Sequence, residues 1–161
     1  MEYLDIVNNN DEVIGQCTVS ESYDKLLPHR ISHIFIFNNE GKMLLQKRTE
    51  EEKFCPNHWS TAVGGHVQAG ESYEEAAIRE YEEELGTKSE LEFIGKTIYE
   101  KENIPKKFLT IFKSNFNGPY NINLDEVAAV DSFSIEEIKN MIESGEKFLP
   151  ELLFILEKYY L

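Results

Sequence analysis

Three glutamates near the middle of the chain, Glu80, Glu83 and Glu84, are spaced so that they could bind a divalent cation. Side chains at positions i, i+3 and i+4 of an α-helix share one face. Carboxylates held this close repel one another by roughly a few tenths of a kcal/mol for each pair. Hard oxygen ligands are also what Mg²⁺ requires in proteins. The spacing therefore predicts a helical face that binds Mg²⁺ or Mn²⁺.

Residues on either side of these glutamates indicate where the helix begins and ends. Ser72 and Glu75 have the spacing of a capping box, which starts a helix. Gly86 is the residue type that most often ends one. An apolar arc of the same helix should pack against a sheet, and it comprises Ala77, Ile78, Tyr81 and Leu85.

The segment before the helix is expected to be held against it. Arg79 lies four residues before Glu83, and a charge-assisted hydrogen bond from Arg79 to Glu71 would hold this loop to the helix. The loop opens with a turn at Gly65, whose carbonyl we expect to point at the glutamates. His66, next to the turn, is either a structural residue or a ligand.

The stretch from Gly65 to Thr87, GHVQAGESYEEAAIREYEEELGT, resembles the Nudix box, the signature of the Nudix hydrolases. It has every glycine and charged residue of that box at the right spacing. Tyr81 and Thr87 depart from the pattern, since aliphatic residues are usual at both positions. Both departures concern packing and leave the metal chemistry intact.

The resemblance implies roles for particular residues. Metal ligands would be Glu80, Glu83, Glu84 and the carbonyl of Gly65. The catalytic set would be Glu80, Glu83, Glu84 and Arg79, with Glu80 either a ligand or the base that activates water. Loop anchors would be Gly65, Glu71, Arg79 and Gly86. Substrate contacts are expected from Arg30, Arg48 and Glu126. The arginines could instead serve solubility, and Glu126 could join the metal site or be a solvated loop residue.

The reaction implied by the resemblance is metal-dependent hydrolysis of a diphosphate linkage. A bound divalent metal polarises phosphoryl oxygens and lowers the pKa of a coordinated water, which attacks phosphorus. The substrate is expected to be a nucleoside di- or triphosphate, or a nucleoside diphosphate linked to another group. A prenyl or other non-nucleotide diphosphate is the alternative, and the general base is left open.

Two other functions are compatible with parts of the sequence but are disfavoured. The stretches YLDIVNNNDEVIGQ, HRISHIFIFNNEGKMLLQKRT and HWSTAVGGHV resemble the Nudix branch that includes isopentenyl-diphosphate isomerases. Gly64 stands where those isomerases have a cysteine, and Cys55 is nine residues earlier, so isomerase activity is disfavoured. A sensor that binds a nucleotide without turnover is also disfavoured, because such Nudix domains usually lose the box glutamates.

The composition of the chain limits the classes of molecule that it is expected to bind. The chain has 161 residues and a formal net charge of −14, which disfavours binding to nucleic-acid phosphates but is compatible with a small phosphorylated substrate screened by a cation. Cys17 and Cys55 are too few for a disulfide framework. Because no basic, apolar leader and no membrane-spanning stretch is evident, we expect a cytoplasmic protein that does not bind membranes.

The pattern of the chain predicts an α/β fold, and the resemblance implies a Nudix-type α/β/α sandwich with a mixed β-sheet. We expect one domain over residues 1–161, with an N-terminal hairpin extension over about 1–30 that could be exchanged in a homodimer. Expected strands are 3–7, 13–17, 33–37, 43–47, 92–99, 108–115 and 128–133, with 33–37 and 43–47 forming a second hairpin. Expected helices are 21–27, one from Ser134 toward Gly145, and one starting near Pro150.

Overall fold

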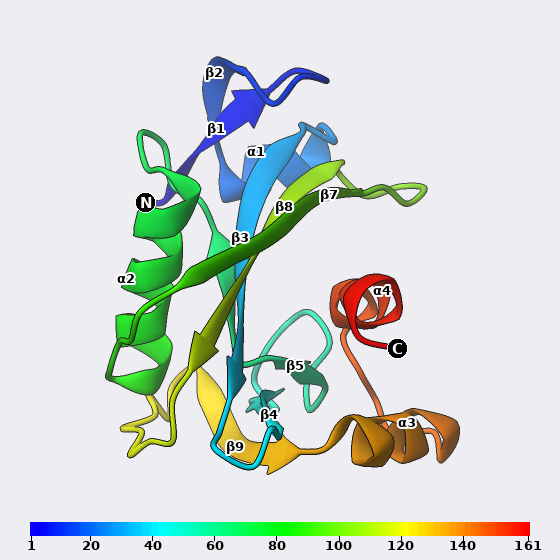
Figure 1. Ribbon diagram of the computed structural model, residues 1–161. Coiled ribbons are helices and arrows are strands. Elements are labelled where there is room, and N and C mark those ends of the chain that lie inside the picture. The colour runs from blue at the N-terminus through cyan, green and yellow to red at the C-terminus, as the bar shows by residue number, and fades with distance from the viewer.

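The computed structural model describes residues 1–161 as a mixed sheet with helices on both faces (Figure 1). The strands are β1 (Tyr3–Val7), β2 (Val13–Thr18), β3 (His29–Phe37), β4 (Met43–Arg48), β5 (Trp59–Thr61), β6 (Val63–His66), β7 (Glu92–Tyr99), β8 (Lys107–Asn115) and β9 (Val127–Phe133). The helices are α1 (Val19–Asp24), α2 (Tyr73–Leu85), α3 (Ile135–Glu143) and α4 (Pro150–Tyr159).

Seven strands form the main sheet, in which β5, β4, β3, β8 and β7 are neighbours in that order. β6 pairs with β3 and β9 pairs with β4. The β3–β8 pair is parallel, whereas the other pairs are antiparallel. β1 and β2 form a separate two-stranded sheet. The predicted α/β class with a mixed sheet is therefore confirmed.

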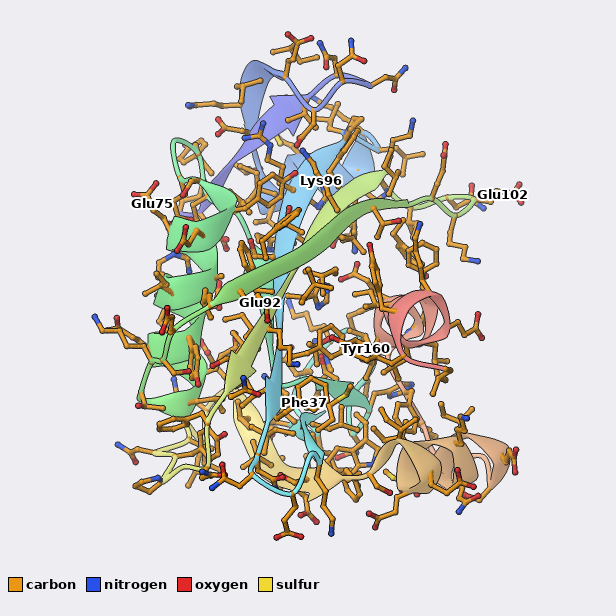
Figure 2. The ribbon with its side chains drawn as sticks, viewed as in Figure 1. Phe37, Glu75, Glu92, Lys96, Glu102 and Tyr160 are labelled. Atoms are coloured by element: carbon orange, nitrogen blue, oxygen red, sulfur yellow. The ribbon has the colours of Figure 1, made fainter.

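Helix α2 covers one face of the sheet, and α4 covers the other (Figure 1). Ala77, Tyr81 and Leu85 of α2 are buried in one apolar cluster with residues of β3 and β4, whereas Ile78 is only partly buried. On the opposite face Tyr160, just after α4, packs against Phe37 of β3 with the two ring planes tilted by 47° (Figure 2). Because consecutive residues of a strand point to opposite faces, β3 contributes to both clusters.

The predicted start and end of α2 are confirmed. Ser72 accepts a hydrogen bond from the backbone of Glu75, whose side chain bonds back to the backbone of Ser72. Gly86 ends the helix in the left-handed region, with φ of 65°. A Cβ at Gly86 would lie 2.5 Å from the backbone oxygen of Asn121, so both conformation and space require glycine here.

Several expected elements were wrong in detail. The hairpin of 33–37 with 43–47 does not form a ladder, because β3 and β4 pair only at Phe37 and Met43, and β4 pairs instead with β5 and β9. β3 also begins earlier, at His29. The short strands β5 and β6 were not expected, and Gly65, where a turn was predicted, lies inside β6 and pairs with Ser32 of β3. α1 begins at Val19 because Thr18 and Glu21 form a capping box there.

A buried polar contact ties α4 to the sheet. Glu151 at the start of α4 accepts a hydrogen bond of 2.6 Å from Nε2 of His33 on β3, and it lies 3.4 Å from Nζ of Lys107 on β8. Burial alone would raise the pKa of Glu151, but the contacts with His33 and Lys107 outweigh it and lower that pKa to about 2. Glu151 is therefore ionised in the folded protein at all but very acidic pH.

We expect this carboxylate to make folding stability dependent on pH. Because the pKa of Glu151 is lower folded than unfolded, its contribution is present above about pH 4.5 and is lost as pH falls toward 2. The lost part is on the order of 3 kcal/mol. Urea unfolding from pH 5 to pH 2 should show the stability gap between wild type and Glu151→Gln closing. Parallel curves for the two proteins would contradict this role.

Candidate active site

Glu84, at the C-terminal end of α2, has one oxygen held and one without a partner. Its side chain is buried between α2 and β4, where the Gln46 amide donates to Oε1. The same amide nitrogen donates to the Ala62 carbonyl, which fixes its orientation. The second oxygen of Glu84, Oε2, is buried and has no hydrogen-bond partner in the protein. A buried carboxylate oxygen without a partner is costly and calls for a positively charged or hydrogen-bonding ligand.

Electrostatics at Glu84 point the same way. Burial, followed by the nearby carboxyl group of Glu80, raises the pKa of Glu84 well above its usual value. The deprotonated form is therefore disfavoured unless a positive charge approaches. Carboxylate oxygens are the ligands that Mg²⁺ and Mn²⁺ prefer. The unpartnered oxygen and the raised pKa together fit a divalent cation at this point.

Glu80 packs directly against the backbone of β6. A Cβ built on Gly65 would lie 2.5 Å from Oε1 of Glu80, which is closer than any real side chain allows. The absence of a side chain at Gly65 therefore makes room for the Glu80 carboxyl group in this position. Gly65 pairs with Ser32 across β3 and β6, so the main sheet fixes its position relative to α2.

Arg79 links the loop after β6, the end of β6 itself and the glutamates. Its guanidinium donates twice to Glu71, with Nε 2.7 Å and Nη2 2.9 Å from the two carboxylate oxygens, as the sequence predicted. It also donates to the carbonyl of His66 at 3.0 Å, and Nη1 contacts Glu80 at 2.8 Å and Glu83 at 3.3 Å. Arg79 is therefore the anchor that holds the loop of residues 67–72 on α2.

Replacing Arg79 with lysine should destabilise the fold by about 1–3 kcal/mol, since an ammonium keeps the charge but cannot form the paired bonds to Glu71. Urea unfolding of the metal-free protein measures this loss. Lys88→Ala, which removes only an exposed pair with Glu82, is the matched control and should shift stability by less than about 0.5 kcal/mol. Equal losses in both variants would refute the anchoring role of Arg79.

The glutamates do not converge on one point as the side chains stand. No group of three histidine, cysteine, aspartate or glutamate side chains is arranged to hold an ion. Glu80 and Glu83 instead face the guanidinium of Arg79. The side chain of Glu83 is 49% exposed and free to turn. Cation binding at this face therefore requires Glu80 and Glu83 to turn from Arg79 toward Glu84.

Other acidic residues gather near this face. Glu126, in the turn before β9, has its pKa raised by burial and then by the charges of Glu80 and Glu83. Glu2, near the N-terminus, has its pKa raised by burial and then by Glu80. Sequence reasoning named Glu126 but missed Glu2 and Gln46, because their proximity depends on tertiary contacts with no local signal in the chain.

The two arginines expected to contact substrate are engaged elsewhere. Arg30 forms an ion pair of 2.7 Å with Asp11 and donates to the carbonyl of the same residue at 2.6 Å, so it anchors the N-terminal hairpin. Substrate contact by Arg30 stays a prediction, and it would require the guanidinium to be shared with Asp11. Arg48 contacts Glu52 and the carbonyl of Phe54, both at 3.1 Å, and is partly exposed. Arg48 stays a candidate for substrate contact.

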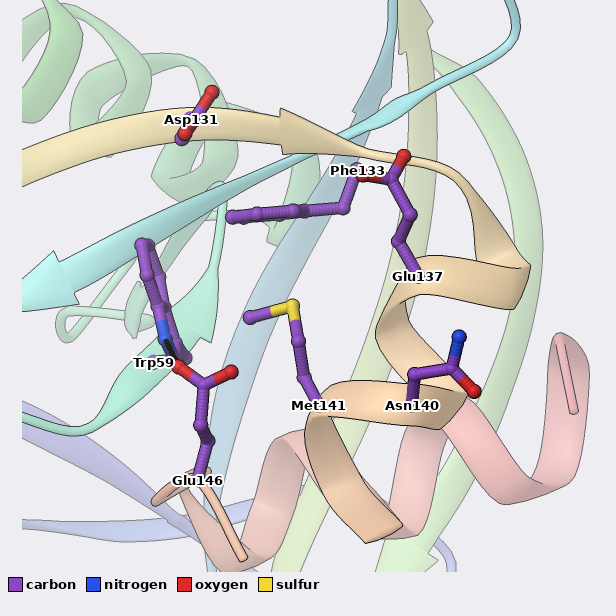
Figure 3. Close-up of a pocket in the computed structure, with 7 residues that line it drawn as sticks. All are labelled: Trp59, Asp131, Phe133, Glu137, Asn140, Met141 and Glu146. Atoms are coloured by element: carbon purple, nitrogen blue, oxygen red, sulfur yellow. Dashed lines mark hydrogen bonds between the residues drawn. The ribbon is translucent and has the colours of Figure 1, made fainter. Parts of the chain in front are cut away.

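Two open depressions lie on the surface. One is on the outer side of α2 and is lined by Glu75, Ile78, Arg79, Glu82 and Glu83. The other lies on the opposite side of the molecule, between β5, β9 and α3 (Figure 3), and is lined by Trp59, Asp131, Phe133, Glu137, Asn140, Met141 and Glu146. Only the first borders the glutamate face. None of the helices is both long and apolar enough to cross a lipid bilayer.

Comparisons with known proteins agree with the sequence and the geometry. The family model for the NUDIX domain matches residues 27–152. The chain is 37% identical to the uncharacterized Nudix hydrolase YfcD of Escherichia coli (strain K12), over 94% of this chain and 83% of that protein. The crystal structure of DR0079 from Deinococcus radiodurans superposes with a TM-score of 0.86 at 24% identity, covering 99% of this chain and 100% of the other. The NUDIX domain of Shewanella oneidensis NrtR, solved with ADP ribose, superposes with a TM-score of 0.61 at 14% identity, covering 80% and 83%.

Proposed function

This chain belongs to the Nudix family, and from that premise we propose that it is a metal-dependent hydrolase of a diphosphate linkage in a nucleoside phosphate or a related organic diphosphate. Its relatives are named Nudix hydrolases. The observation that carries the proposal is the buried, unpartnered Oε2 of Glu84 beside the Glu80 carboxyl group. This is the arrangement in which a divalent cation would relieve an unfavourable buried charge.

The residues of the proposed site have distinct roles in metal binding and catalysis. Glu80, Glu83 and Glu84 would hold Mg²⁺ or Mn²⁺, which when bound polarises phosphoryl oxygens and lowers the pKa of a water. Gln46 orients Glu84 through its amide. The backbone carbonyl of Gly65 is proposed as a further ligand. A carboxylate not occupied in binding, Glu80 or the nearby Glu126, is proposed to accept the proton of the attacking water.

The proposed substrate is a small phosphorylated molecule in which phosphate links to a nucleoside. One fold neighbour was solved in complex with ADP ribose, a nucleoside diphosphate joined to a second group, which supports this class. The charge of −14 disfavours a nucleic-acid partner. With two free cysteines, of which Cys17 is buried, we propose a reducing, cytoplasmic location.

The proposal is tested by phosphate and pyrophosphate release from a panel of nucleoside di- and triphosphates, sugar nucleotides, dinucleoside polyphosphates and prenyl diphosphates, each with Mg²⁺ or Mn²⁺. We expect release from one nucleotide class. Saturable binding of a nucleotide without release from any compound would favour a sensor instead. Conversion of an isopentenyl to a dimethylallyl diphosphate is not expected, since Gly64 offers no side chain to move a proton.

A further inference from the structure

The buried network around His33 extends to Gly64 and Gly65 of β6, next to the proposed site. Besides its bond to Glu151, His33 contacts Oγ1 of Thr61 on β5 at 2.9 Å through Nδ1. The side chains of His33, Glu151 and Lys107 are only 3%, 9% and 10% exposed. A buried ion pair seldom stabilises a protein more than apolar packing of the same volume would. Holding α4 in place therefore does not by itself account for this network.

The imidazole of His33 lies against the backbone of Gly64. The two residues are directly opposite in the antiparallel β3–β6 pair. A Cβ on Gly64 would lie 3.2 Å from Nδ1 and 3.4 Å from Cε1 of His33, which is tighter than an ordinary contact. The imidazole thus rests on the strand at the point where a side chain of residue 64 would otherwise be.

The next residue of the same strand faces the other way. Gly65 is turned toward α2, and its missing side chain makes room for the carboxyl group of Glu80. The Gly64–Gly65 segment is therefore a thin backbone layer with His33 on one side and Glu80 on the other. If this segment moved by a few tenths of an ångström toward His33 or toward Glu80, the distance between the Gly65 backbone and the Glu80 carboxyl group would change.

We propose that His33 is a positioning residue for the metal face: held by Glu151 and Thr61, it supports Gly64 and so fixes the Gly65 backbone against Glu80. This inference rests on the proposed function. Because an ionised carboxylate can only accept, Nε2 of His33 carries the proton that is donated to Glu151, and this bond sets the ring orientation. Mutation of residues that hold metal ligands in place, without binding the metal themselves, typically lowers metal affinity or activity by about 10–100-fold.

The test measures Mn²⁺ affinity of the metal-free protein by electron paramagnetic resonance, together with kcat and KM. His33→Ala should weaken Mn²⁺ binding and lower kcat by about tenfold each, with KM little changed. Gly64→Ala should weaken Mn²⁺ binding about threefold by crowding the imidazole, yet have no further effect in a His33→Ala background, where that crowding is absent.

Leu152→Ala is the matched control, because Leu152 follows Glu151 on α4 and is fully buried but makes no polar contact with the sheet. It should lower thermal stability and leave Mn²⁺ affinity unchanged. Two results would overturn the positioning role of His33 while leaving the proposed function intact. One is additive losses of Mn²⁺ affinity in His33→Ala and Gly64→Ala; the other is a Mn²⁺ affinity in His33→Ala within twofold of wild type. Wild-type protein that neither binds Mn²⁺ nor turns over any diphosphate would overturn the proposed function as well.

Discussion

Replacing Glu83 with glutamine should lower kcat by about 10³-fold while the protein stays folded. A metal supplies several kcal/mol of transition-state stabilisation, and each 1.36 kcal/mol corresponds to a factor of about ten. The substitution keeps the size of the side chain. The Glu83 side chain contacts Arg79 at 3.3 Å and is half exposed, so folding should be unaffected. Initial rates at saturating Mg²⁺ and a thermal melt measure both expectations.

Glu82→Gln is the control for this experiment, since Glu82 is the neighbouring residue on α2 but pairs with Lys88 on the exposed surface. Its kcat should stay within about twofold of wild type. Full hydrolysis by the Glu83→Gln protein would show that Glu83 is not a metal ligand. A loss in Glu83→Gln that came with a collapsed melting transition would point to a structural role instead.

Replacing Glu84 with glutamine should abolish turnover and yet stabilise the metal-free protein by about 1–3 kcal/mol near pH 8. Glu84 is buried with one oxygen unpartnered, and glutamine removes the buried charge while its carbonyl can still accept from Gln46. Because the folded-state pKa of Glu84 is raised, wild-type stability falls as pH rises through that pKa. The gain in the variant should therefore be largest at high pH and vanish near pH 4.

Replacing the two buried glutamates, Glu84 and Glu151, should have opposite effects on folding stability at pH 8. Glu151→Gln is therefore the informative comparison for Glu84→Gln. Glu151 has its pKa lowered by His33 and Lys107, so its replacement should destabilise the protein at pH 8. Mg²⁺ should raise the melting temperature of wild type but not of Glu84→Gln. Destabilisation of metal-free Glu84→Gln at pH 8, or an equal effect of Mg²⁺ on both proteins, would contradict the strained, metal-binding role of Glu84.

The parts of the fold that depend on local signals could be predicted from the sequence. The start of α2 follows from a capping box within four residues, and its end follows from Gly86. The contact between Arg79 and Glu71 was predicted because both residues belong to one loop and helix. Short-range patterns therefore account for the helix that carries the candidate site, whereas its neighbouring strand β6 was not predicted.

Contacts between distant segments could not be predicted in the same way. The pairing of β4 with β9 joins residues 79 to 90 positions apart, and nothing in either strand specifies its partner. Gln46 reaches Glu84, and Glu151 reaches His33, only because the sheet and helices bring them together. Arg30 has the residue type of a phosphate ligand, yet the tertiary fold pairs it with Asp11.

The most direct test of the central claim is turnover of the best substrate in ¹⁸O-labelled water after divalent ions have been removed and then restored. Protein stripped with EDTA should release no product, and Mg²⁺ should restore release. One labelled oxygen should appear in a phosphoryl product, because water attacks phosphorus. Turnover that persists in EDTA, or products whose phosphates carry no label, would contradict a metal-dependent diphosphate hydrolase.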